Sequence, residues 1–232
     1  MKSIKKQLSQ HGKDGFDRKY FAKVLKKYDT DELERLTYLF TGLFNFLDKY
    51  LDLRSQKGKE VLEIGCHIGA FAKVLKTEGF DVTAGDISKF IIKKAKKLQK
   101  DMLFKVINVE NEILINKKFD YVFSIGVVEH LNNPKKAFIN IRKKLKKGGS
   151  FIFLTPYPCK QAFDDVTHIN VHDSDWWVKL GRKTGFKEFK FNYALWIPYI
   201  YKLGKRFSIW LPIKINIPPL FISSSYMFYF KN

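Results

Sequence analysis

A glycine turn followed at a fixed distance by an acid is the pattern with the clearest chemistry. In VLEIGCHIGAF a short apolar run ends near Glu63, and Gly65 and Gly69 flank a turn that leads into a helix-like segment. Glycine lets backbone approach a ligand closely, and the first N–H groups of a helix attract anions. Asp86 follows Gly65 by about 20 positions, the spacing of an acid that accepts bonds from ribose hydroxyls. The pattern predicts a site for a nucleoside-bearing cofactor; the alternative is an ordinary strand-to-helix connection.

A parallel sheet is needed to bring such residues together, and strands and helices alternate from Lys59 onward. Apolar runs predict strands, and apolar residues at steps of three and four predict helices. Gly148 and Gly149 are expected to stop the helix before them. Strands this apolar imply a parallel sheet covered on both faces. Strands are expected at 61–64, 81–86, 104–109, 119–125, 150–156, 186–193 and 225–231, and helices at 18–27, 31–53, 89–100, 134–146 and 174–184.

The chain reads as one domain with additions at both ends. We expect a helical cap over 1–58, a cofactor-binding core over 59–193, and an aromatic and basic insertion with a closing strand over 194–232. The mixture of aromatic and basic residues in 194–219 suits a pocket-covering insertion or contact with a membrane surface. The covering role is favoured, and a lipid-linked ligand would account for both.

Charge and cysteine content limit the partners and the compartment. The formal net charge is +20, from 43 Lys and Arg against 23 Asp and Glu. Such a field gathers nucleic acid or anionic lipid, but the cations are mostly lysines spread over helices, which favours a solvated surface. Two cysteines cannot build a disulfide framework, so we expect a reducing, cytoplasmic setting. No apolar run is long enough to predict a signal peptide or a transmembrane segment.

The motifs resemble those of class I S-adenosylmethionine-dependent methyltransferases, particularly the ubiquinone-biosynthesis-type and sugar O-methyltransferases. VLEIGCHIGAF is similar to their first motif, VTAGDIS to the second, and FDYVFSIGVVEHL to the fourth-strand motif. The resemblance covers about 59–193. It implies S-adenosylmethionine as cofactor and a Rossmann-like α/β fold with a mostly parallel seven-stranded sheet, helices on both faces and an antiparallel last strand.

The resemblance also assigns cofactor-binding roles. Glu63 and the turn after it match the part that surrounds the methionine moiety, and His67 stands where the family usually has glycine. Asp86 matches the ribose acid, and Ile87 the residue beside the adenine. Asn108 offers an amide carbonyl where the family places Asp. The implied cofactor-binding residues are Glu63, Gly65, Cys66, His67, Gly69, Asp86, Ile87, Asn108, Val109, Ser124 and Ile125.

Catalytic candidates lie on loops after the fourth and fifth strands. Methyl transfer to oxygen needs alignment and proton removal, so a His or carboxylate is useful. DVTHINVH resembles a loop of small-molecule and glycan methyltransferases, and His168 is its best candidate base, with holding the loop through Asp165 as the alternative. His130 is a weaker candidate that could instead orient the cofactor loop. The predicted catalytic set is His168, His130 and Asp165; Glu129 and His172 are further candidates on these loops.

Some of these candidate residues could instead bind a metal ion. Some relatives carry E-x-x-E-H with a distant His, and Glu129, His130 and His168 partly fit that pattern. Gly126 stands where the first Glu belongs, which leaves too few ligands. The sequence therefore predicts no metal.

The leading hypothesis is methylation of a hydroxyl on a small-molecule or glycan-type acceptor by in-line displacement. An RNA-modifying methyltransferase is the first rival, because of the net charge, although no D/N-P-P-[YF] motif is present. A catalytically degenerate domain that binds cofactor or a partner is the second, because of His67 and Asn108.

Overall fold

The computed structural model describes residues 29–197, 208–214, 216–217 and 222–232. The helix expected at 18–27 and parts of the 194–219 segment lie outside these residues. The division into 1–58, 59–193 and 194–232 stays a prediction.

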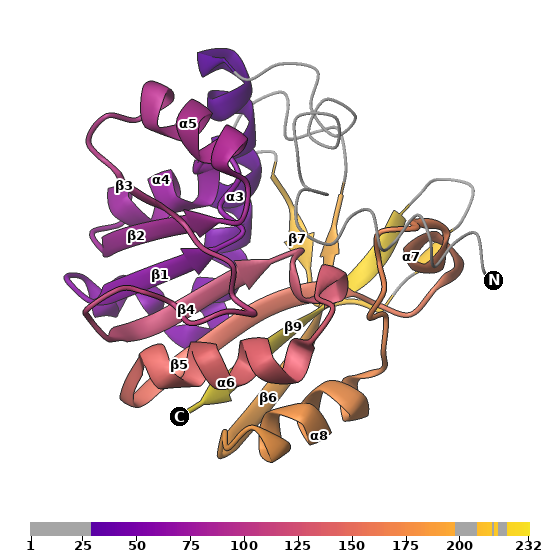
Figure 1. Ribbon diagram of the computed structural model, residues 1–232. Coiled ribbons are helices and arrows are strands. Elements are labelled where there is room, and N and C mark those ends of the chain that lie inside the picture. The colour runs from indigo at the N-terminus through magenta and orange to yellow at the C-terminus, as the bar shows by residue number, and fades with distance from the viewer. Residues whose placement is uncertain (1–28, 198–207, 215, 218–221) are drawn as a thin grey trace.

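One sheet runs through the described residues in the order β3-β2-β1-β4-β5-β9-β6-β7, with β8 paired to β9 (Figure 1). Its strands are β1 (Glu60–Ile64), β2 (Asp81–Asp86), β3 (Leu103–Val106), β4 (Phe119–Ile125), β5 (Leu145–Pro156), β6 (Glu188–Trp196), β7 (Trp210–Leu211), β8 (Asn216–Ile217) and β9 (Ile222–Lys231).

The sheet confirms the predicted α/β fold class. Strands β1 to β5 pair in parallel, and β9 lies antiparallel between β5 and β6. Since β6 is also antiparallel to β9, it runs in the direction of β5. These seven strands are the seven that were predicted. The short strands β7 and β8 were not predicted, because two residues are too few for a periodic signal.

Helices cover both faces of the sheet (Figure 1). One core cluster contains buried residues of α3 (Thr30–Leu51), α4 (Ala70–Thr77) and α5 (Lys89–Leu98). The other contains residues of α6 (Pro134–Lys144) and α8 (Ser174–Lys183). Helix α3 begins after the cap Asp29, whose carboxylate accepts the Glu32 amide at 2.9 Å. None of the described helices is long and apolar enough to cross a membrane.

The α6–β5 boundary differs from the prediction. Helix α6 ends at Lys144, and β5 begins at Leu145, before the glycines expected to stop the helix. Leu145 is buried and pairs with Phe119 of β4. The register then shifts between Phe119 and Tyr121, and Gly148 takes a φ of 75°. The glycines therefore permit an irregularity within the strand and do not end the helix.

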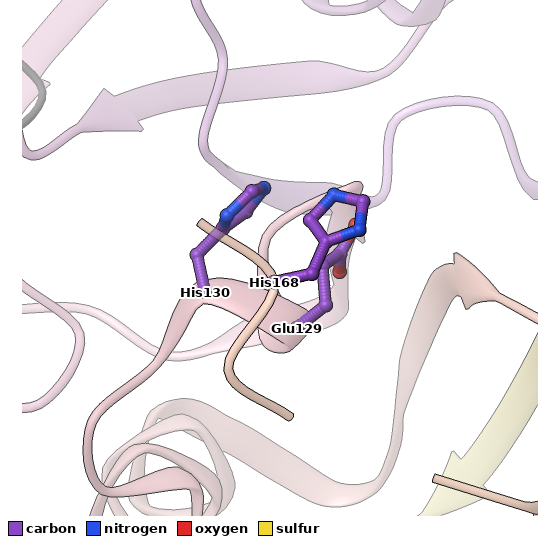
Figure 2. Close-up of side chains that lie close together, drawn as sticks. All are labelled: Glu129, His130 and His168. Carbon is purple, nitrogen blue, oxygen red and sulfur yellow. The ribbon is translucent and has the colours of Figure 1, made fainter. Parts of the chain in front are cut away.

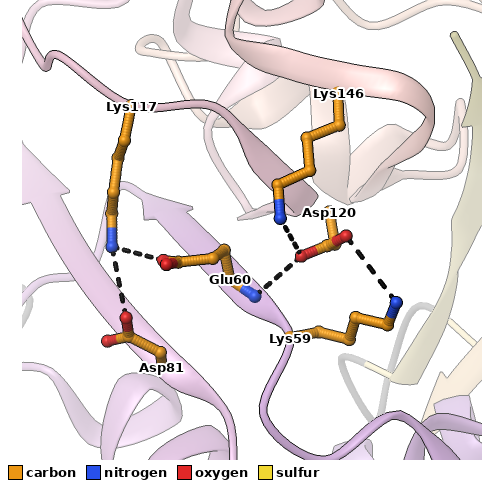
Figure 3. A network of polar contacts seen from close by, with 6 residues as sticks. All are labelled: Lys59, Glu60, Asp81, Lys117, Asp120 and Lys146. Carbon is orange, nitrogen blue, oxygen red and sulfur yellow. Dashed lines mark hydrogen bonds and ion pairs between the residues drawn. The ribbon is translucent and has the colours of Figure 1, made fainter.

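A charged network joins the amino ends of several strands (Figure 3). The Asp120 carboxylate accepts the Glu60 amide at 2.9 Å and the Lys146 ammonium at 2.8 Å. Lys117 pairs with Glu60, and its ammonium lies 3.4 Å from Asp81. The predicted ligand-binding residues lie at the opposite, carboxyl ends.

Candidate functional site

The glycine turn between β1 and α4 has the geometry that was predicted. Gly65 and Gly69 have φ values of 79° and 83°. A Cβ on Gly65 would lie 2.1 Å from Val127, and one on Gly69 would lie 2.6 Å from Phe104. Gly65 and Cys66 both donate their amides to the Gly85 carbonyl, at 2.7 and 2.9 Å. The turn is therefore closed onto the end of β2, and no larger residue fits at either glycine.

Asp86 lies at the end of β2, beside this turn. Its carboxylate accepts the His67 amide at 3.1 Å and the Ser88 amide at 2.9 Å. Burial raises the pKa of Asp86 to about 6, against the opposing effect of the Ser88 and His67 amides. A carboxylate has further lone pairs, so Asp86 can still accept bonds from a ribose.

His67 adopts the left-handed conformation, with a φ of 53°. This is the position where the resembling family has glycine, and the backbone here keeps the conformation that glycine favours. Burial lowers the pKa of His67 to about 4, so its ring is neutral at pH 7.

Glu63 presents a buried carboxyl group at the same turn. It is 3% exposed, and its Oε2 has no hydrogen-bond partner among the described residues. Burial raises its pKa to about 8. A positively charged hydrogen-bond donor would satisfy this oxygen, and the methionine ammonium of S-adenosylmethionine is such a donor. Burial also raises the pKa of the Cys66 thiol, so Cys66 contributes as a small apolar wall.

The remaining predicted cofactor residues lie at the ends of neighbouring strands. Ile87 is 39% exposed directly after β2, where an adenine ring could cover it. The Asn108 side-chain carbonyl accepts the Glu110 amide at 3.0 Å, which uses one of its two lone pairs. Val109 and Ser124 are buried, and Ile125 follows Ser124 at the end of β4. The cofactor roles of these residues remain proposals.

A second cluster lies after β4 and contains Glu129, His130 and His168 (Figure 2). One ligand atom of each residue lies within 4.8 Å of the others. The imidazole rings of His130 and His168 are 4.8 Å apart between centroids. Val127, which touches Gly65, lies two residues before Glu129. The cluster is therefore adjacent to the cofactor turn.

Hydrogen bonds fix the tautomers of both histidines. Nδ1 of His168 lies 2.9 Å from the Ala162 carbonyl, and Nδ1 of His130 lies 3.0 Å from the Thr167 carbonyl. Because a carbonyl only accepts, each Nδ1 carries the proton. Nε2 is therefore the ring nitrogen of His168 that can accept a proton, and it lies 3.6 Å from the Asp165 carboxylate.

The loop after β5 is held onto the turn Val128–His130 (η2) by several bonds. Asn170 donates its backbone amide to the Glu129 carbonyl at 2.9 Å and its side-chain amide to Leu131. Asp165 accepts both the amide and the hydroxyl of Thr167. His172 lies elsewhere on this loop and stacks on Trp176 at 3.7 Å. The structure thus brings His168, His130 and Asp165 together and leaves His172 outside the cluster.

Burial determines the charge state of the cluster. Burial raises the pKa of Glu129 to about 8. Burial, followed by the neighbouring His168, lowers the pKa of His130 to about 4. Both groups are neutral near pH 7. Three ligand atoms could hold a divalent ion, but a spread of up to 4.8 Å is wider than bonds of about 2.0–2.2 Å produce in a tetrahedral site. The absence of a metal stays a prediction.

Sequence reasoning missed two residues that support the site. Gln99, buried at the end of α5, donates to the carbonyls of Ile68 at 2.7 Å and Gly69 at 3.1 Å, and so fixes the cofactor turn. Thr155 of β5 is buried, and its side chain lowers the pKa of Glu129, against the larger effect of burial. The sequence offered one signal for Gln99, which is a polar residue at the buried edge of a helix rich in lysine. It offered none for Thr155.

Comparison with known proteins identifies the class. The family model described as a methyltransferase domain matches residues 35–188. A ubiquinone biosynthesis O-methyltransferase of Rickettsia akari is 32% identical over 107 residues, 45% of this chain and 43% of that protein. A tRNA U34 carboxymethyltransferase of Sulfurovum sp. is 32% identical over 118 residues, 48% of this chain and 38% of that protein. The matches to these two relatives span less than half of their length.

A similar solved structure extends the likeness to nearly the whole fold. The magnesium protoporphyrin IX methyltransferase of Synechocystis PCC 6803 aligns with a TM-score of 0.64 at 14% identity, covering 97% of this chain and all of that one. This likeness is one of fold; the family model, which matches more than half of the chain, shows that the chain belongs to the methyltransferase-domain family. The predicted class, a domain of the S-adenosylmethionine-dependent methyltransferases, is confirmed, and with it S-adenosylmethionine as the cofactor of the class.

Proposed function

We propose that this domain methylates a hydroxyl group of a small-molecule or glycan-type acceptor, with His168 as the base. The observation that carries the proposal is the Nε2 lone pair of His168 beside Asp165, next to the cofactor turn. The ubiquinone-type relative, named as an O-methyltransferase, supports an oxygen acceptor.

The residues act by binding, orientation and proton removal. Bound S-adenosylmethionine supplies a methyl group on a positively charged sulfur. Glu63 and Asp86 would hold its ammonium and ribose, and the closed turn at Gly65 would set the direction of the methyl group. The acceptor oxygen would take the methyl group, with S-adenosylhomocysteine as the leaving group, and the proton of the hydroxyl would pass to Nε2 of His168. Asp165 then stabilises the imidazolium.

The acceptor class can be tested with labelled methyl groups. Transfer from S-adenosylmethionine is measured into extract of the source cell, split into nuclease-treated, protease-treated and solvent-partitioned fractions. Label in nuclease-resistant saccharide or lipid-linked material supports the proposal. Label that disappears with nuclease overturns the acceptor class.

The role of His168 is tested with a matched pair of variants. His168→Gln should lower kcat by about a hundredfold, the lower end of general-base effects, with unchanged affinity for S-adenosylhomocysteine. His172→Gln is the control, because His172 lies on the same loop outside the cluster. Equal activities of the two variants would contradict the assignment.

A second candidate function is modification of RNA. It is favoured by the net charge of +20 and by α5, whose ten residues include five lysines and no acid. The tRNA carboxymethyltransferase relative supports it as well. Peripheral membrane contact through 194–219 also stays a proposal, which sedimentation with anionic vesicles would test.

A further inference from the structure

Three tyrosines and one lysine from separate segments of the chain lie together near the carboxyl end of β5. Tyr157 follows β5 directly, Tyr193 belongs to β6, and Tyr226 belongs to β9. Lys214 lies between β7 and β8. We call these four residues the tyrosine–lysine cluster.

The rings of this cluster are in mutual contact. The ring centroid of Tyr226 lies 5.5 Å from that of Tyr157 and 5.6 Å from that of Tyr193. The Lys214 ammonium lies 5.1 Å from the ring of Tyr157 and 5.8 Å from the ring of Tyr193. These are cation–π distances, so the rings hold the ammonium in one place.

The ammonium is fixed but its charge is not neutralised. A hydrogen bond to the Tyr157 hydroxyl raises the pKa of Lys214. No carboxylate of the described residues forms an ion pair with Lys214, and the side chain is exposed. A positioned, solvent-accessible cation beside phenol hydroxyls can bind an anion.

The cluster lies on the side of the sheet where Glu129, a neighbour of the proposed base His168, is found. Thr155, whose side chain influences the pKa of Glu129, is paired with Tyr226 in the β5–β9 register. Tyr157 is two residues further along the chain and contacts Tyr226. The hydroxyl of Tyr226 also interacts with Ser174, the first residue of α8. A row of contacts therefore leads from Glu129 to Lys214.

We infer that the tyrosine–lysine cluster is an acceptor subsite that binds an anionic group, carboxylate or phosphate, next to an aromatic or other flat part of the acceptor. The inference rests on the proposed function, because it needs an acceptor at the Glu129 side of the sheet. Lys214 with the Tyr157 hydroxyl would bind the anion, and the half-buried ring of Tyr193 would contact the flat part, with the buried Tyr226 packed against it.

The test uses three probes that share a phenyl ring: benzoate, phenyl phosphate and benzyl alcohol. Each is titrated into the full chain with saturating S-adenosylhomocysteine, and the tyrosine ring signals are followed by NMR, with Tyr157→Phe to assign its signal. The variants are Lys214→Met and, as a control, Lys190→Met, an exposed lysine in β6.

At least one anionic probe should shift the tyrosine signals and bind Lys214→Met about tenfold more weakly than the wild type, as expected for loss of a charged hydrogen bond. Lys190→Met should bind that probe like the wild type, and benzyl alcohol should not distinguish Lys214→Met from the wild type. Equal effects on benzoate and phenyl phosphate indicate a general anion site, and an effect on one alone identifies the preferred group.

No binding of either anion, or equal binding by the wild type and Lys214→Met, would overturn the subsite. Affinity for S-adenosylhomocysteine is measured by calorimetry on the same samples. Normal cofactor binding without anion binding removes only the subsite. Loss of cofactor binding in the wild type would instead contradict the proposed function.

Discussion

Glu63 is a buried acid with a pKa near 8 and an oxygen that no described group satisfies. A nearby ammonium or sulfonium favours the ionised form of such a group. Cofactor binding should therefore release a proton below pH 8. We expect the affinity for S-adenosylmethionine, measured by calorimetry, to rise from pH 6 to pH 8 by up to about tenfold per pH unit.

Glu63→Gln is the control for this pH dependence. The variant should bind more weakly and show a flatter pH profile over the same interval. A wild-type affinity that does not change with pH would contradict the ammonium contact. Without cofactor, the raised pKa of Glu63 makes the protein less stable as pH rises. The folded state holds the Glu63 proton more tightly than the unfolded state does, so the free energy of unfolding decreases between about pH 4.5 and about pH 8.

His67 allows a direct measure of backbone strain, because its φ is 53°. His67→Ala removes the ring and keeps a Cβ, whereas His67→Gly removes both. The left-handed conformation costs a residue with a Cβ roughly 1–2 kcal/mol. The glycine variant should therefore be more stable than the alanine variant by about 1 kcal/mol in urea unfolding, the reverse of the usual order in a helix. Equal stability, or a more stable alanine variant, would show that the strain is small.

Whether Glu129, His130 and His168 bind a metal ion is also a property of individual side chains. The separation of the ligand atoms of Glu129, His130 and His168 favours a metal-free cluster. Dialysis against EDTA should leave methyl transfer unchanged within about twofold, since a metal acting as a Lewis acid is worth several kcal/mol. Loss of activity that Mg²⁺ or Zn²⁺ restores would establish a metal site at these residues.

At the scale of elements, Asp120 joins β4 to β1 and β5. Although burial alone would raise its pKa, the Lys146 ammonium and the Glu60 amide lower the net value. Asp120→Asn should cost about 1 kcal/mol near pH 7, in the range of charge-assisted hydrogen bonds at a partly exposed site. Urea unfolding would measure it.

The Asp120 effect should have a defined pH dependence. A carboxyl whose pKa is lowered on folding stabilises the protein above its unfolded pKa, and that stabilisation is lost as pH falls through the folded value. The two proteins should thus become equally stable in acid. Asp164→Asn, which removes an exposed helical ion pair with Lys160, is the control and should cost less than about 0.5 kcal/mol.

The elements also show how far the sequence alone could lead. Apolar strand runs and apolar residues at helical spacing define most of the fold, since their signals are local. The start of β5 was misplaced because Leu145 is drawn into the sheet by its pairing with Phe119. The tyrosine–lysine cluster could not be predicted, because its members are brought together only by the β5–β9–β6 pairings.

At the scale of the whole molecule, the open question is whether the positive surface belongs to the function. Lys93, Lys96 and Lys97 are exposed on α5, which contains no acid. Any such surface binds RNA through phosphate contacts, and each contact adds about 0.7–0.9 to the slope of log affinity against log salt. RNA binding alone therefore does not distinguish a functional surface from a compositional one.

Replacing these three lysines with glutamine separates the two cases. If the acceptor is a small molecule or glycan, the triple variant should bind tRNA more weakly and with a smaller salt slope, while methyl transfer to the nuclease-resistant fraction stays within about twofold of the wild type. If methyl transfer falls together with tRNA affinity, the lysine surface delivers the acceptor and the proposed acceptor class is wrong. The acceptor class thus depends on whether the two activities separate, because α5 follows β2, the strand that ends in Asp86, whereas the proposed base His168 follows β5.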